Sequence, residues 1–353
     1  MTSTPASDLS EAIRERLERQ EDACLAPLAA RSRGAERLRE EPSSPMRTEF
    51  QRDRDRIIHT KSFRRLMHKT QVFIGPHGDH YRTRLTHTLE VTQIARTVGR
   101  ALALNEDLIE AIGMGHDLGH TPFGHAGERA LAEVIPGFRH NEQSLRLVDR
   151  LENDGQGLNL TAPVRDGILR HSKSRASILQ SHSSQPATLE GHVVKIADGV
   201  AYLNHDLDDA IRAGIISGSD IPREVIAGLG SRHSERINTL VADIITHSNV
   251  TDAPGLVTMS EGVRAAADVL RNFLFERVYD PINARPETIE AQKIVRTHYN
   301  YFMEHPEEMP EQYVVSRNDD AVERHVADFV ASMTDRFATE LYQRLHAPSV
   351  LAP

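Results

Sequence analysis

The chain has 353 residues, of which 39% are hydrophobic and 26% charged, and a formal net charge of −9. This charge argues against a protein that binds nucleic acid mainly through its overall electrostatic field. No run approaches the roughly 20 apolar residues of a membrane span, and the polar N-terminal region has no signal-peptide pattern. The single cysteine, Cys24, excludes an internal disulfide and fits a reducing compartment, so we expect a cytoplasmic protein with no membrane partner.

Nearly every periodic segment of the chain predicts an α-helix. In chain order, helices are expected at about 8–20, 49–69, 85–102, 106–115, 141–152, 187–213, 231–248, 260–279, 286–304 and 319–346. Asn105 is expected to cap the helix that leads to His116, because Asn accepts hydrogen bonds from a first helical turn. Glycine, proline and polar residues predict loops at 31–45, 153–163, 250–256, 280–286 and 305–310.

Strand patterns are almost absent, since only a few residues around Val72–Ile74 and Val314–Ser316 alternate in the way that a strand requires. The fold class is therefore predicted to be all-α. Residues 1–45 are expected to form a flexible N-terminal arm, and residues 46–353 a single all-α domain with a C-terminal helical extension.

Metal-binding residue types crowd the segment from Gly115 to Glu128. His116 and Asp117 are neighbours there, and two further candidate ligands, His87 and Asp198, lie on other predicted helices. Adjacent residues on a regular helix point about 100° apart, so His116 and Asp117 can share one ion only near a helix end. If the four side chains converge, they can hold a divalent cation that activates water against a phosphate ester.

An acidic face follows Asp198 along its helix. Asp198, Tyr202, Asp206 and Asp209 are spaced so that they share this face. Such a line can be the solvent side of an amphipathic helix. Three acids without interleaved lysines would repel one another, however, which favours a bound cation or a ligand hydroxyl.

A second pair of histidines follows the His-Asp dipeptide. His125 and Glu128 are three residues apart, so they can share a helical turn, and His120 precedes them. A carboxylate beside an imidazole raises its pKa and orients it, which suits a proton-transfer group. Glu128 in a first helical turn would also stabilise that helix by about 0.3–1 kcal/mol, and both interpretations can hold together.

These motifs, in this order, resemble the HD-domain metal-dependent phosphohydrolases, and among them the deoxynucleoside triphosphate triphosphohydrolase (dGTPase-like) family. The resemblance covers Arg47 to Arg56, Phe63 to Leu66, Lys69 to Phe73, Tyr81 to His87, His116 to Glu128, His140 to Ser144, Ala197 to Tyr202 and Met333 to Arg336. It implies an HD-type helical fold around a central metal site.

The resemblance also implies roles for individual residues. The metal ligands would be His87, His116, Asp117 and Asp198, holding Mn, Mg, Fe, Co, Ni or Zn. The catalytic residues would be His120 and His125, over the α-phosphate, with Glu128 as the partner of His125. The substrate-binding residues would be Gln71, Val72, Arg84, Tyr202 and Asp206. Within that last set, Gln71 and Asp206 would read the sugar 3′-hydroxyl, Tyr202 would pack on the deoxyribose, and Arg84 would contact phosphate.

The reaction that the resemblance implies is hydrolysis of a dNTP, such as dGTP, to deoxynucleoside and inorganic triphosphate. It also implies a homo-oligomer built from dimers, a tetramer or hexamer. Whether a dNTP acts as an allosteric ligand and whether single-stranded DNA binds are left open. A polar contact is further implied at His140 or, one residue along, at Asn141.

Two other functions stay open from the sequence. The chain could be another HD-type nucleotide phosphohydrolase, a 5′-nucleotidase or phosphodiesterase, but such an enzyme has no need for the deoxyribose set of Gln71, Tyr202 and Asp206. It could also be a non-catalytic nucleotide- or DNA-binding protein, against which the intact His120, His125 and Glu128 argue.

Overall fold

A computed structural model describes residues 6–74, 82–172, 185–314 and 320–346 of the chain. Within these ranges the structure is all-α, as predicted, and its only β-type pairings are isolated bridges. No helix among the described residues is long and apolar enough to cross a membrane.

The helices fall into two consecutive sets. The first set runs as far as the long helix that carries Asp198 and comprises α1 (Ala6–Cys24), α2 (Glu49–Ile58), α3 (Lys61–Arg65), α4 (Arg84–Ala101), α5 (Glu106–Gly115), α6 (His125–Val134), α7 (His140–Arg146), α8 (Glu152–Gly155), α9 (Ala162–Arg170) and α10 (Leu189–Arg212). The second set comprises α11 (Arg223–Leu229), α12 (His233–His247), α13 (Glu261–Leu274), α14 (Asp280–Asn283), α15 (Pro286–Glu304), α16 (Glu311–Val314), α17 (Val322–Ser332) and α18 (Asp335–His346). A 3-10 turn (Leu66–His68) follows α3, and π-helical turns (Leu147–Leu151 and Phe275–Tyr279) extend α7 and α13. Further 3-10 turns lie at Gly218–Asp220 and Pro306–Glu308.

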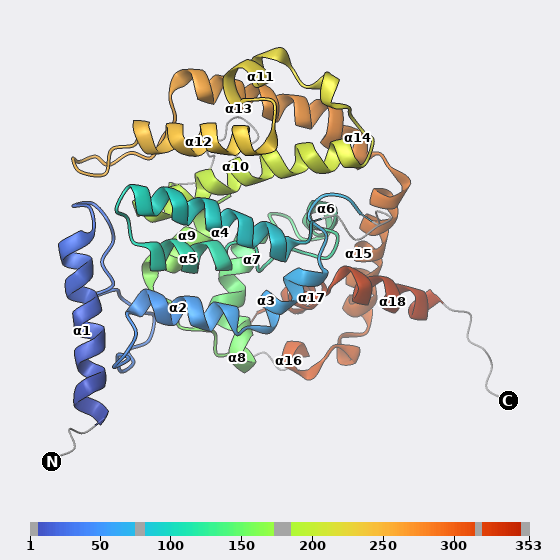
Figure 1. The fold of residues 1–353 in the computed structure, drawn as a ribbon. Coiled ribbons are helices and arrows are strands. Elements are labelled where there is room, and N and C mark those ends of the chain that lie inside the picture. Colours follow the sequence, from blue (N-terminus) through green and yellow to red (C-terminus); the bar gives the residue numbers. More distant parts are fainter. Residues whose placement is uncertain (1–5, 75–81, 173–184, 315–319, 347–353) are drawn as a thin grey trace.

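The centre of the molecule is a stack of helices (Figure 1). Helix α4 packs between α10 and α5, and α5 packs on α2. Helices α11 to α13 cover the far side of α10, while α15 packs against α6, α17 and α18. Helix α1 stands at the opposite edge of the molecule from α18.

Two hydrophobic cores hold this arrangement together. The larger core joins the central stack to α11–α13 and includes Leu118, while the smaller core joins α6 to α15, α17 and α18 and includes Phe123. The segment from Leu118 to Phe123 therefore passes from one core to the other. Burial of apolar side chains at both ends anchors this segment, which carries His120.

Local signals in the sequence explain where the central helices begin. Asn105 accepts a hydrogen bond from the Leu108 N–H at 3.2 Å, which confirms the predicted cap of α5. Thr83 caps α4 in the same way, through the Thr86 N–H. Helix α5 ends at Gly115, so His116 and Asp117 do lie at a helix end, as their sharing of one ion requires.

Three predicted boundaries were wrong. The helix expected over 49–69 breaks after Ile58, where the Thr60 hydroxyl accepts from the Phe63 N–H and starts α3. The helix expected over 319–346 breaks before Asp335, because Thr334 caps α18 through the Phe337 N–H. The predicted loop 280–286 contains α14, whose first turn tolerates a proline.

Helices α9, α11 and α16 were not among the predicted helical patterns, and most of α8 falls in the predicted loop 153–163. Of α6, only the helical turn shared by His125 and Glu128 was expected. No strand forms at Val72–Ile74. The other strand-like pattern ends at Val315 and Ser316, which lie outside the described residues.

The segment predicted as an N-terminal arm contains α1 and a connection, residues 25–45, that packs on the central stack. Ala26, Ala29 and Ser32 are buried there. The Arg37 side chain binds Glu49 and Asp53 of α2. The domain boundary at residue 45 stays a prediction.

Candidate metal-dependent active site

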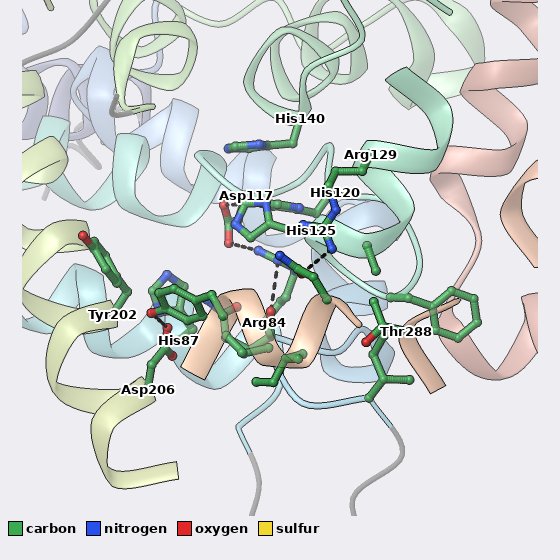
Figure 2. Close-up of a pocket in the computed structure, with 18 of the residues that line it drawn as sticks. Arg84, His87, Asp117, His120, His125, Arg129, His140, Tyr202, Asp206 and Thr288 are labelled. Atoms are coloured by element: carbon green, nitrogen blue, oxygen red, sulfur yellow. Dashed lines mark hydrogen bonds and ion pairs between the residues drawn. The ribbon is translucent and has the colours of Figure 1, made fainter. Parts of the chain in front are cut away.

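A cavity of about 450 Å³ opens between α4, α6, α10 and the C-terminal end of the π-helical turn before α14. All the predicted site residues line it except His116 and Glu128, which lie behind its wall. Figure 2 shows Tyr202, His87 and Asp206 on one side, His120, His125 and His140 on the other, and Arg84 and Asp117 between them. The structure thus brings together residues that lie far apart in the sequence.

The four predicted metal ligands meet where the first turn of α4 and the C-terminal end of α5 approach the middle of α10. One ligand atom from each of His87, His116 and Asp198 lies within 4.8 Å of the other two, and the His87 Nε2 is 3.2 Å from an Asp198 oxygen. Asp117 approaches this group through one carboxylate oxygen, 3.4 Å from the His116 Nε2. Its other oxygen accepts a hydrogen bond from Arg84 at 2.7 Å.

The hydrogen bonding of His116 fits a metal ligand. Its Nδ1 lies 2.7 Å from the Gly113 carbonyl oxygen and must donate to it, so the Nε2 of the neutral ring carries a lone pair. This buried Nε2 has no hydrogen-bond partner. An unpaired buried acceptor costs about 1–3 kcal/mol, and a cation at the Nε2 would remove that cost.

The surroundings of Asp117 favour the ionised form of its carboxyl group. Burial raises its pKa, but His116, His120 and Arg84 together hold the pKa well below its usual range. Arg84 itself is 1% exposed, so its charge acts on Asp117 with little screening by solvent. The site therefore presents a fixed negative charge to a cation.

The second group of histidines is organised by Glu128. One Glu128 oxygen lies 2.8 Å from the His125 Nδ1, as predicted, and the other accepts from the ring and the backbone N–H of His140. The His140 ring stacks on His120, with centroids 4.0 Å apart. Burial raises the pKa of Glu128, but His140 and His125 lower it well below its usual range.

A glycine sets the position of His125. Gly124 precedes α6 with a φ of 57°. A Cβ there would lie 3.1 Å from the backbone oxygens of Thr70 and Gln71, so only glycine lets these two segments approach. This contact sets the first turn of α6 beside the segment that carries Gln71.

Of the predicted sugar-binding residues, Tyr202 and Asp206 lie across the cavity from the second histidine group, whereas Gln71 belongs to the segment beside the start of α6. Asp206 accepts a hydrogen bond from the Tyr279 hydroxyl at 2.5 Å. Burial raises the pKa of Asp206 to about 7. The Oε1 of Gln71 is buried without a hydrogen-bond partner, so it is an acceptor available to a ligand hydroxyl.

Three residues at the site were missed or left open by the sequence reasoning. His140 was one of two alternatives, and the structure favours it over Asn141, whose side chain donates to the Leu169 carbonyl. His171 was not singled out, although it lies at the end of α9 with its Nε2 3.2 Å from the His140 Nε2. Tyr279 was not singled out either, and only its position at the end of the helix predicted over 260–279 could have drawn attention to it.

Comparisons with known proteins agree with this geometry. An HD domain matches residues 84–203, and a phosphohydrolase-associated domain matches residues 257–344. A deoxyguanosinetriphosphate triphosphohydrolase-like protein of Caldanaerobacter subterraneus is 52% identical over 96% of this chain and 96% of its own length. Proteins with the same name from Desulfatibacillum aliphaticivorans and Clostridium tetani are 46% and 44% identical, over 96% of this chain and 99% and 97% of their own lengths.

The chain belongs to the deoxyguanosinetriphosphate triphosphohydrolase-like family. It is a phosphohydrolase of the metal-dependent HD type, and its histidine and acidic cluster can bind a metal ion. The substrate, the oligomeric state, the cellular location and the roles of the individual site residues stay predictions.

Proposed function

We propose that this member of the dGTPase-like family hydrolyses deoxynucleoside triphosphates to deoxynucleoside and inorganic triphosphate. The observation that carries the proposal is that one cavity holds both the histidine and acidic cluster and the residues suited to a deoxyribose. A monophosphate or cyclic-nucleotide hydrolase requires the first group but not the second. The names of the relatives are consistent with a nucleotide substrate.

His87, His116, Asp117 and Asp198 would hold the cation. When bound, it would polarise a phosphoryl oxygen and lower the pKa of water. Arg84 would neutralise phosphate charge, since it lies beside Asp117 and its buried Nε has no hydrogen-bond partner. The reaction would join a water oxygen to the α-phosphorus and break the bond from that phosphorus to the 5′-oxygen.

His125 is suited to protonate the departing 5′-oxygen. Its ring is exposed toward the cavity, and Glu128 lies against its Nδ1, which leaves the Nε2 to face a substrate. Gln71 and Asp206 would hold the 3′-hydroxyl, and Tyr202 would pack on the sugar where a ribose 2′-hydroxyl would clash. The substrate would thereby be oriented with its α-phosphate toward the ligand group.

Product analysis tests this proposal. The purified protein is incubated with each of the four dNTPs, with GTP and with an equimolar dNTP mixture, in Mn²⁺ or Mg²⁺. Free deoxynucleoside and intact triphosphate are expected, with little turnover of GTP. Turnover of the mixture alone would indicate activation by a nucleotide, while release of monophosphate and pyrophosphate, or no turnover at all, would contradict the proposed reaction.

Asp117→Ala is the matched variant for this experiment. Because Asp117 is the charged link between the ligand group and Arg84, its loss should abolish metal binding and activity together. Retained turnover in this variant would contradict the assignment of Asp117 as a ligand.

A further inference from the structure

Arg129 lies in a part of the cavity to which the proposed reaction gives no role. It follows His125 by four residues in α6, so the two side chains lie on one face of this helix, and both line the cavity. Figure 2 shows Arg129 on the side of the cavity away from Tyr202 and Asp206. An arginine in this position is available to a part of the substrate other than its sugar.

The guanidinium of Arg129 forms no ion pair with the described part of the chain. One of its N–H groups donates to the Asn283 side-chain oxygen at 2.7 Å. The two nearby glutamates are engaged elsewhere, since Glu128 binds two histidines and Glu133 binds Arg296. Burial lowers the pKa of Arg129, although both glutamates act to raise it. The remaining N–H groups of this five-donor side chain are therefore available to a ligand with acceptor atoms.

The surroundings of Arg129 favour an aromatic base over a polyphosphate. Among the described residues that line the cavity, the only other arginine or lysine is Arg84, which binds Asp117. Asp280, on the same short helix as Asn283, adds a negative charge. The lining next to Arg129 and Asn283 in sequence is otherwise apolar and includes Phe123, Ala126 and Ile282. A triphosphate would require several cations, whereas one arginine among apolar side chains suits the polar edge of a ring.

A base attached to the proposed sugar position would extend toward Arg129. Gln71 is followed along the cavity lining by Ile74. Tyr279, which donates to the carboxylate proposed to bind the sugar, is followed by Asn283, the partner of Arg129. Both segments thus line the cavity beyond the proposed sugar contacts, and a base between them would meet the guanidinium.

We propose that Arg129, oriented by Asn283, recognises the base of the substrate and selects guanine. Guanine presents two adjacent acceptors, O6 and N7, which match the paired donors of an arginine. Adenine presents N7 beside an amino group, so a donor of the base would face a donor of the protein. The inference rests on the proposed function, because the proposed sugar contacts determine where the base lies.

The ratio of kcat/KM for dGTP to that for dATP tests this inference. We expect the full-length protein in Mn²⁺ to prefer dGTP by about tenfold or more, and Arg129→Met to reduce the preference to within about twofold. Arg129→Lys, which retains the charge but not the paired donors, should also lose most of the preference. Arg296→Met, which changes the arginine that pairs with Glu133, should retain it. A ratio measured on one preparation does not depend on the fraction of folded protein.

Two analogues test the atoms of the base. We expect dITP, which retains O6 and N7, to be hydrolysed within about threefold of dGTP, and 7-deaza-dGTP, which lacks N7, to lose about tenfold. In Arg129→Met this loss should disappear. Equal kcat/KM for dGTP and dATP in the wild type, or an unchanged ratio in Arg129→Met, would overturn the proposal.

Binding without turnover separates this inference from the proposed reaction. The affinities of chelator-treated protein for dGTP and dATP are measured by calorimetry. A preference for dGTP that is lost in Arg129→Met, in a protein that releases no triphosphate when metal is added, would contradict only the proposed function. In such a protein, equal affinities for the two nucleotides, or no binding of either, would overturn the inference as well.

Discussion

Glu128 is the residue through which two histidines of the cavity are oriented. One of its oxygens binds His125 and the other binds His140. Among the described residues, no other carboxylate lies within salt-bridge distance of either ring. An amide at this position has one acceptor and one donor group. It can satisfy only one of the two rings in its present tautomer.

Glu128→Gln should therefore lower kcat by about 10²–10³-fold with little change in KM, because the proton-transfer geometry is lost while the substrate contacts remain. Steady-state kinetics with the preferred dNTP measures this. Glu133→Gln changes an exposed glutamate of the same helix, which pairs with Arg296, and should leave kcat within about twofold. Equal kinetics in the two variants would contradict the role given to Glu128.

Asp206, a predicted substrate-binding residue, affects the pH dependence of the stability of the protein. Its pKa of about 7 in the folded protein exceeds the value of about 3.9 in an unfolded chain, so folding takes up a proton. Stability is therefore lost as the pH rises from about 4 to about 7. Asp206→Asn should stabilise the metal-free protein by up to about 4 kcal/mol at pH 8 and by much less at pH 5.

Urea denaturation at the two pH values checks this prediction. Asp208→Asn on the same helix provides a control of opposite sign: burial raises the pKa of Asp208, but His233 and Arg236 lower it below the usual range. This second variant should be less stable than the wild type at pH 8. A destabilised Asp206→Asn protein at pH 8 would show that the carboxylate is stabilised by its surroundings.

The sequence allowed prediction of the site residues that belong to an ordered motif, and the structure places them around one cavity. His171 was not predicted as a site residue because its contacts are with residues distant in the sequence. Its partner His140 is 31 residues away, and no spacing within α9 distinguishes it from an ordinary helix-terminal histidine. Convergence of this kind depends on the packing of α7 against α9, which periodicity cannot show.

At the scale of elements, the first turn of α18 organises the loops of the cavity. One Asp335 oxygen accepts from the Thr70 N–H and the other from the Phe123 N–H, both at 2.8 Å. The buried Lys69 ammonium donates to the backbone carbonyls of His120 and Ala331. The phosphohydrolase-associated region thus fixes both the Gln71 segment and the loop that carries His120.

Asp335→Asn should lower kcat/KM by about 10–100-fold. The amide oxygen of Asn can accept from only one of the two N–H groups, so either the Gln71 segment or the loop that carries His120 should shift. A displacement of about 1 Å at the reacting groups has an effect of this size. Glu340→Gln, which changes an exposed glutamate of the same helix, should have no effect. The amount of bound metal distinguishes a positioning role of Asp335 from general misfolding. None of the predicted metal ligands lies on α18, so a correctly folded Asp335→Asn protein should still bind metal. Loss of bound metal in Asp335→Asn, or unchanged kinetics, would contradict this role.

Helix positions were predictable from the sequence where an apolar stripe is long, as in α10 and α15, whose ends lie within about two residues of the predicted ones. Helix ends were less predictable where a threonine cap interrupts a continuing pattern. Thr60 and Thr334 both sit inside apolar periodicity and still start new helices, because each hydroxyl satisfies an N–H of the following turn. The spacing of apolar residues does not show whether a threonine hydroxyl forms such a local hydrogen bond.

At the scale of the whole molecule, Arg37 joins three segments that are distant in sequence. Its side chain, 6% exposed, binds Glu49 and the fully buried Asp53 of α2. It also donates to the Asn159 carbonyl, 122 residues along the chain. The connection before α2, which belongs to the predicted N-terminal arm, is thereby bound to the helical stack.

Arg37→Met should lower the free energy of unfolding by about 3–5 kcal/mol, because removing one partner of a buried ion pair leaves the other charge uncompensated. Burial already raises the pKa of Asp53 against the opposing effect of Arg37, so the loss should be larger at pH 8 than at pH 5, where the unpaired carboxyl can take up a proton. Urea denaturation at both pH values measures the change.

Arg33→Met is the control variant. It removes an exposed arginine that pairs with Glu18 and Asp22 of α1, and its denaturation midpoint should match the wild type. If Arg37→Met also matched the wild type, residues 25–45 would contribute little to folding, as expected for a flexible arm that ends at residue 45.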